Sequence, residues 1–139
     1  MVFDLDSAAR GFRAAELRGA YIVRYKRPGF AFARDTVRRQ LRPASSLSNG
    51  FDRYQLSLAE LHWPGGISYV PDTLMAHNYR LVLPAASRQY DLSNLEISIA
   101  IGTSGCCNCP TNVRRRLLLN GQPIVADGGG ENTSVVVRR

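Results

Sequence analysis

Apolar and polar residues alternate most regularly just before residue 102. Branched apolar side chains occupy every second position there, at Leu95, Ile97, Ile99 and Ile101. The residues between them are polar or small. Because successive side chains of a strand point to opposite faces of a sheet, this pattern predicts a strand with one buried face.

Shorter segments of similar character recur along the chain. Segments rich in aromatic and branched residues lie at 20–26, 54–58, 67–70, 78–83, 113–119, 123–126 and 134–139. Turn residues separate them, and Asn120-Gly121 is typical of a type I′ hairpin turn. Short strands at this spacing, without βαβ alternation, predict a mainly β fold: an antiparallel sandwich or small barrel, of which a jelly roll is one form.

The first 42 residues combine helical and strand patterns. Apolar residues at helical spacing predict a helix over 4–18, and a second short helix is expected over 34–41, ending before Pro43. Small and polar residues over 43–50 indicate a loop. We therefore divide the chain into a short, basic, helical extension at 1–42, packed on or extending from the body, and an antiparallel β domain at 43–139.

Charge reinforces this division. The chain has 139 residues, a length that fits one domain, and its net charge is +7. Residues 1–42 carry ten basic and four acidic side chains, a balance of +6, and residues 43–112 carry three and five, a balance of −2. Residues 113–139 carry five and two, a balance of +3. Arginine outnumbers lysine 17 to 1, as expected for bidentate contacts or for codon bias.

The sequence favours no membrane span and no secretion signal. It has no apolar run of about 18 residues, and its first residues are acidic. Three clustered cysteines do not form a disulfide framework. We expect no cofactor, and either a virion or, failing that, the cytoplasm as the location.

Candidate chemistry is sparse. Cys106 and Cys109 have the spacing of a zinc-ligand pair, but no second such pair completes a site, so we expect no metal and mainly reduced thiols. His62 and His77 are the only histidine bases, and neither lies in a nucleophile motif. The sequence therefore predicts a protein that is not an enzyme, with no catalytic residue.

Arginines mixed with aromatics form the strongest candidate site. The predicted contact residues are Arg24, Lys26, Arg27, Arg34, Arg38, Arg39 and Arg42, with a second cluster at Arg114, Arg115 and Arg116. Such residues can neutralise phosphates and stack on bases, or they can contact another subunit. On a strand, Arg114 and Arg116 would face one way and Arg115 the other, so they cannot form one flat patch.

Three functions follow from this layout. The first is a structural protein that forms a symmetric oligomer, because a β domain with a basic N-terminal segment is similar in layout to small coat or accessory proteins of viruses and phages. The second is a small nucleic-acid-binding β barrel. The third is a small enzyme or ligand-binding barrel.

Overall fold

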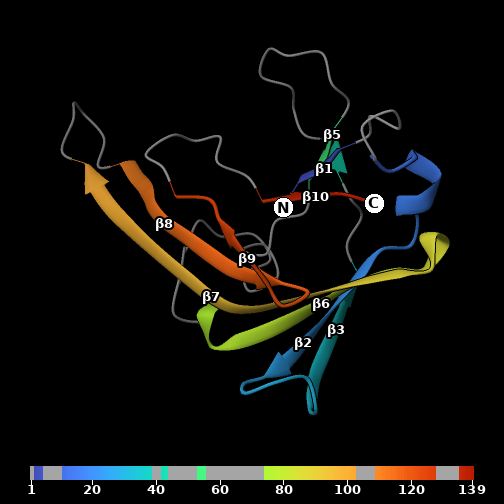
Figure 1. Ribbon diagram of the computed structural model, residues 1–139, viewed down its shortest axis with the longest axis horizontal. Coiled ribbons are helices and arrows are strands. Elements are labelled where there is room, and N and C mark those ends of the chain that lie inside the picture. Colours follow the sequence, from blue (N-terminus) through green and yellow to red (C-terminus); the bar gives the residue numbers. More distant parts are fainter. Residues whose placement is uncertain are drawn as a thin grey trace.

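The computed structural model describes residues 2–4, 11–38, 42–43, 53–55, 74–102, 109–127 and 135–139 (Figure 1). The elements are, in order, β1 (Val2–Asp4), η2 (Ala14–Leu17), β2 (Tyr21–Lys26), β3 (Ala33–Arg38), β4 (Arg42–Pro43), β5 (Arg53–Gln55), β6 (His77–Leu83), η4 (Pro84–Ala86), β7 (Arg88–Gly102), β8 (Cys109–Leu119), β9 (Gln122–Val125) and β10 (Val136–Val137). The η elements are single turns of 3₁₀ helix.

A six-stranded antiparallel sheet dominates the fold. Its strand order is β3-β2-β6-β7-β8-β9, and each neighbouring pair is antiparallel. A smaller sheet has the order β10-β1-β5-β4, in which β1 and β10 run parallel. The described part of the chain is therefore mainly β with few helices, which agrees with the predicted sandwich or barrel.

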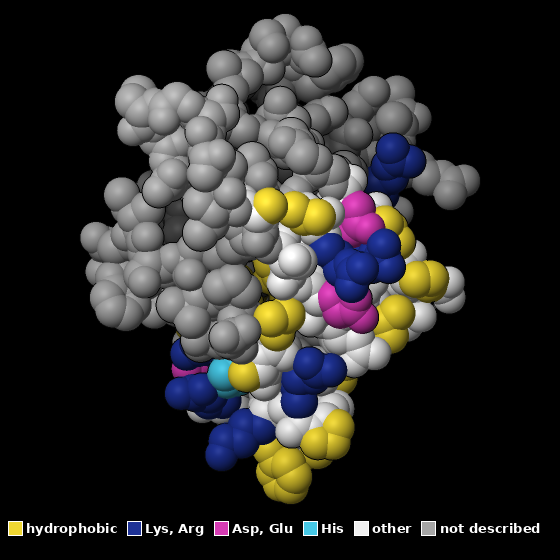
Figure 2. Space-filling view, turned by 90° about the vertical axis from the view of Figure 1, so that its left-hand side faces the viewer, with side chains coloured by type: hydrophobic (Ala, Val, Ile, Leu, Met, Phe, Trp, Pro, Cys, Tyr) yellow, Lys and Arg dark blue, Asp and Glu magenta, His cyan; other side chains and the backbone are white. Residues whose placement is uncertain are grey.

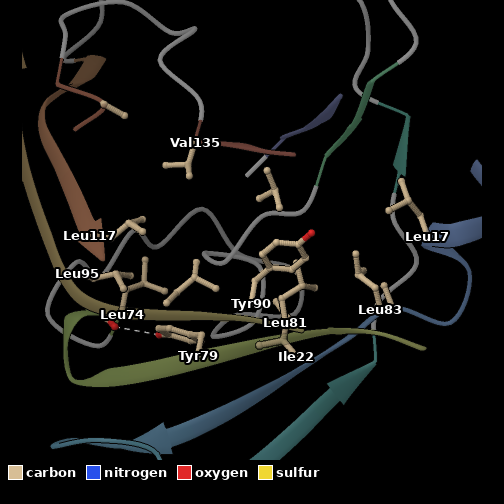
Figure 3. Close-up of a cluster of buried hydrophobic side chains, with 14 of the residues drawn as sticks. Leu17, Ile22, Leu74, Tyr79, Leu81, Leu83, Tyr90, Leu95, Leu117 and Val135 are labelled. Carbon is tan, nitrogen blue, oxygen red and sulfur yellow. Dashed lines mark hydrogen bonds between the residues drawn. The ribbon is translucent and has the colours of Figure 1, made fainter. Parts of the chain in front are cut away.

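The core lies against one face of the large sheet. In Figure 3, the buried side chains fill the space between that sheet and strands β1, β5 and β10. Tyr79, Leu81 and Leu92 have no exposed surface. The Tyr79 hydroxyl donates a hydrogen bond to the Leu74 carbonyl at 3.0 Å, so its polar end is satisfied inside the core.

Several strands predicted from alternation are confirmed. The predicted strand at 20–26 is β2, the strand at 78–83 is β6, and the strand at 95–102 is the second half of β7. The predicted hairpin at Asn120-Gly121 joins β8 to β9, with φ of 50° and 79° at the two turn residues. Two positive φ angles are what a type I′ turn requires.

Both predicted helices need correction. Residues 33–38 form strand β3, so the helix expected over 34–41 is wrong. Pairing with β2 explains the difference, because Val37 then faces Ile22 and packs against the core. The helix expected over 4–18 is not a continuous helix either: Asp4 ends strand β1, and the only helical turn described there is η2.

Other predictions fall outside the described residues. They concern the greater part of the loop at 43–50, the second half of the strand at 54–58 and the whole strand at 67–70.

The basic N-terminal part contributes directly to the large sheet. Strand β2 lies between β3 and β6, and it pairs with β6 from Tyr21 opposite Val82 to Lys26 opposite His77. Residues 21–38 are therefore integral to the sheet, and they position the arginines considered below.

Candidate interaction surface

Strands β2 and β3 form a hairpin whose closed end projects at the bottom of Figure 1. Its turn contains a cis Arg27-Pro28 bond and Gly29, whose φ of 80° favours glycine. The Lys26 amide donates to the Phe32 carbonyl at 3.2 Å. The Asn78 side chain donates to the Gly29 carbonyl at 2.9 Å, which fastens the turn to β6.

The closed end of this hairpin exposes an aromatic side chain and carries several basic residues. Phe32 is 75% exposed, the largest exposed fraction among the large apolar side chains of the described residues. Lys26, Arg27 and Arg34 near it are also exposed. Figure 2 shows hydrophobic side chains at the lower end of the molecule with Lys and Arg side chains close by. We call residues 26–34 the hairpin tip.

Phe30, by contrast, packs onto the sheet. Its ring lies edge-on to Tyr25, with centroids 5.3 Å apart, and the Arg80 guanidinium lies 5.1 Å from the Phe30 centroid and 5.4 Å from that of Tyr25. Arg80 also donates to both Asp91 oxygens, at 2.6 and 2.8 Å. These contacts anchor the tip to β6 and β7.

On the core-facing side of the hairpin, Arg24 and Asp35 form a two-pronged ion pair. Nε of Arg24 donates to Asp35 at 2.5 Å, and its Nη2 binds the second oxygen. Hydrogen bonding from Arg24 holds the pKa of Asp35 below its ordinary value. Reciprocally, Asp35 raises the pKa of Arg24. Arg24 is therefore committed to the fold.

Next to this pair, a bulge directs Arg34 toward a buried histidine. The β2–β3 register shifts between Arg24 and Tyr25, which leaves Arg34 as the extra residue of β3. Its Nη1 lies 2.7 Å from Nε2 of His77, which is 5% exposed. Because the arginine can only donate, Nε2 of His77 accepts this bond. His77, the one sequence-predicted base that the structure describes, is thus engaged by an arginine.

The second predicted cluster, Arg114 to Arg116, lies on β8, and Arg116 is already bound within the chain. Arg116 donates to Asp127 at 2.9 and 2.5 Å, and the backbone amide of Arg115 donates to the same carboxylate at 3.0 Å. These bonds lower the pKa of Asp127. Arg114 and Arg116 are exposed, whereas Arg115 is half-buried.

The structure gathers some predicted contact residues and separates others. Arg24, Lys26, Arg27, Arg34 and Arg38 all lie on the β2–β3 hairpin. Strands β6 and β7 separate this hairpin from Arg114 and its neighbours on β8. Arg42 belongs to β4 of the smaller sheet, and Arg39 lies outside the described residues.

The availability of the hairpin cations differs from residue to residue. Arg27 donates to the Met75 carbonyl at 2.8 Å and to Asn94 at 3.3 Å, and Arg38 lies 5.8 Å from the Tyr21 ring centroid. Within the described ranges, no carboxylate forms an ion pair with Lys26, Arg34 or Arg38. Arg34 is bound to His77, however, so Lys26 and Arg38 are the exposed hairpin cations best placed to meet a partner.

The sequence analysis missed the aspartates, and it did not distinguish the exposed Phe32 from the other aromatics of the basic segment. In three places an aspartate follows its partner arginine by eleven residues, at Arg24–Asp35, Arg80–Asp91 and Arg116–Asp127. Arg24–Asp35 and Arg80–Asp91 are directly opposed across paired strands. For the Arg24–Asp35 pair, the signal that could have found it was a hairpin register for β2–β3, which the expected helix at 34–41 concealed.

The described residues do not test the metal candidate. Cys106 lies outside the described residues, and Cys109 begins β8. Among the residues described, no three or more His, Cys, Asp or Glu side chains group so that they could hold a metal ion. In the same residues, no helix has the length and apolar character needed to span a membrane.

Comparison of the chain with protein-family models, curated proteins and solved structures finds no match.

Proposed function

We propose that this chain is a non-enzymatic structural subunit, of the kind found in virions or phage particles, that forms a symmetric oligomer through its β domain and its basic hairpin. The observation that carries the proposal is the hairpin tip, where Phe32 is largely exposed and the exposed basic residues Lys26, Arg27 and Arg34 belong to the same turn. The tip is anchored to β6 and β7, so it presents a fixed shape to a neighbour.

An exposed phenylalanine on an anchored hairpin is well suited to a protein interface. Burying a side chain of this size is worth roughly 1.5–3 kcal/mol, which stays unrealised while the ring faces water. Interfaces are enriched in aromatics and arginine, with polar groups around an apolar centre. The hairpin tip has this composition on a small scale.

The internal ion pairs favour a protein contact over a phosphate contact. Arg24, Arg80 and Arg116 each bind an aspartate with two hydrogen bonds. An arginine already held by a carboxylate gains less from a phosphate, because it must first break the existing bonds. Two of these three arginines, Arg24 and Arg116, were predicted contact residues.

Nucleic-acid binding is a second candidate, favoured by one observation. Residues 21–38 carry five basic side chains and one acidic side chain, and the exposed Phe32 could stack on a base. Binding of this kind weakens steeply as salt rises. A labelled single-stranded oligonucleotide, titrated at several salt concentrations, tests it: no binding at low salt removes this candidate.

The assembly proposal is tested by comparing Phe32→Ser with a matched control, Val113→Ser, by sedimentation velocity across a concentration series. Val113 is also exposed, at 50%, but it lies on β8. The burial energy above corresponds to roughly a 10–150-fold rise in the concentration needed for half-assembly. Phe32→Ser should show this rise with an unchanged melting temperature, and Val113→Ser should assemble normally.

Two results would count against the assembly proposal. One is equal assembly of the parent chain and Phe32→Ser. The other is an equal loss of assembly in both variants, which would mean that general surface hydrophobicity, rather than the hairpin tip, drives association.

A further inference from the structure

Exposed apolar side chains occur at both ends of the large sheet. Besides Phe32, the exposed large apolar side chains of the described residues are Val125, at 65%, and Val113, at 50%. Val125 ends β9, the outermost strand on the side of the sheet opposite to β3. The two most exposed of these side chains, Phe32 and Val125, therefore lie near opposite edges of one sheet (Figure 1).

Strand register places Val125 on the face of the sheet that points away from the core. Leu117 and Ile124 are directly opposed in β8 and β9; Leu117 is buried in the core, and Ile124 packs against it. Since successive side chains of a strand alternate in direction, Val125 and Pro123 face the other way. Pro123 is also exposed, and Leu118, opposite it in β8, is half-buried. We call Leu118, Pro123 and Val125 the β9 patch.

The β9 patch offers side chains to a partner rather than an open backbone edge. β9 covers only Gln122–Val125, and Pro123 within it has no N–H to donate. Short edge strands with proline resist pairing with another chain. A contact at this end of the sheet is therefore made by packing against the exposed face, which is where Val125 lies.

Charge disfavours contact between two hairpin tips and permits contact between a tip and the β9 patch. The hairpin tip carries three basic side chains and no acidic one, so two tips that meet repel each other. Beside the β9 patch, charges balance. Arg116 lies directly opposite Val125 on one side and Glu96 on the other, and it donates its side-chain hydrogen bonds to Asp127. Arg114 adds a second cation, and Glu96 is exposed and forms no ion pair within the described residues.

We propose that the hairpin tip of one subunit packs against the β9 patch of the next copy of the chain, with Phe32 lying over Val125. This contact is head-to-tail, because it joins two different surfaces of the same chain, and its repetition forms a ring if the rotation between subunits closes. The basic residues of the tip then lie on the side of the sheet that carries Glu96. The inference rests on the proposed assembly function, because it names the surface that receives the tip.

Sedimentation velocity with the full-length chain first tests the patch alone. Val125→Ser removes an exposed apolar side chain and should raise the concentration needed for half-assembly roughly tenfold, with an unchanged melting temperature. Val113→Ser makes the same change at the other exposed valine and should leave assembly unchanged. If Val125→Ser lowers the melting temperature, Val125→Thr replaces it, because threonine keeps the β-branched shape.

Mixing two defective chains then tests the head-to-tail arrangement. Phe32→Ser retains the β9 patch, and Val125→Ser retains the hairpin tip, so the two variants form one complete contact between them. At a concentration at which neither variant associates alone, their equimolar mixture should contain a complex with one copy of each and no larger species. A fluorescein label on one variant identifies this complex in the sedimentation profile. Contact between two tips would instead give no complex in the mixture.

The outcomes separate this inference from the proposed function. Absence of the mixed complex, when both variants melt at the temperature of the parent chain, would overturn the head-to-tail contact. Normal assembly of Val125→Ser would overturn the role of the β9 patch, while a loss of assembly in Phe32→Ser would leave the proposed function standing. If the parent chain is a monomer at every concentration, or associates only with a bound oligonucleotide, both the contact and the proposed function are wrong.

Discussion

Replacing Asp35 with asparagine tests whether the hairpin arginines serve the fold. Asp35→Asn keeps the size of the side chain but removes the charge that Arg24 binds with two hydrogen bonds. The Arg24 side chain is only 12% exposed, so the variant leaves a poorly hydrated guanidinium with a weaker acceptor. The hairpin should therefore lose stability, and the packing of Val37 against the core should weaken with it.

The size of the loss follows from the exposure of the pair. A hydrogen-bonded contact with a charged group contributes roughly 1.5–3 kcal/mol. Asp35 is 36% exposed, and solvent screening of that carboxylate reduces the figure to about 1–2 kcal/mol. For a domain of this length, that corresponds to a melting temperature lower by roughly 3–8 °C.

The effect should also depend on pH in a defined direction. Because Arg24 holds the pKa of Asp35 below its ordinary value, the folded chain binds that proton less readily than the unfolded chain. The stabilisation is complete well above the unfolded value of about 4 and is lost as pH falls through the lowered folded value. The difference between the parent chain and Asp35→Asn should therefore narrow on acidification.

Urea unfolding followed by circular dichroism, at neutral pH and again below pH 4, measures both effects. Asp127→Asn is the matched control, since Asp127 also binds an arginine but Arg116 is 45% exposed, and its effect should be smaller. A loss for Asp35→Asn no larger than for Asp127→Asn, or one that is independent of pH, would refute the structural role assigned to the Arg24–Asp35 pair.

Further stability predictions concern the core and one turn, each checked by urea unfolding. Leu92→Ala removes a side chain with no exposed surface and should lower the unfolding free energy by roughly 2–5 kcal/mol; a loss below about 1 kcal/mol would contradict its place in the core. Tyr79→Phe leaves the Leu74 carbonyl without its donor and should lower it by about 1–3 kcal/mol, whereas no loss would mean that the hydrogen bond contributes nothing. Gly121→Ala places a residue with a Cβ at a backbone φ of 79°, while Asn120 is retained as the first turn residue. It should lower the unfolding free energy by about 1–2 kcal/mol. An unchanged urea midpoint would argue against the type I′ geometry.

The sequence predicted those strands whose pattern is set locally. Leu95 and Ile97 in β7 belong to a regular alternation, and Asn120-Gly121 has the residues that a type I′ turn requires. These features depend on the pleat and on backbone sterics, both of which can be read within a few residues.

The remaining features of the fold and of the candidate surface depended on how strands distant in the sequence pair with one another. Residues 34–41 have apolar side chains at helical spacing, yet Ala33–Arg38 becomes a strand because β2 offers it a partner and the core receives Val37. Without that register, nothing in the sequence places Asp35 opposite Arg24 or sets Phe32 at a projecting turn. The sequence shows where the arginines are and how much charge they carry. The strand pairing decides whether each one binds an aspartate or faces a partner.

One measurement decides whether the chain associates with copies of itself and whether it does so without nucleic acid. It is the light-scattering mass of the full-length chain across a concentration series, with absorbance at 260 and 280 nm recorded over the same peak. A structural subunit should give a defined oligomer with the absorbance ratio of protein alone. A monomer at every concentration, or a particle that exists only with bound nucleic acid, would contradict it.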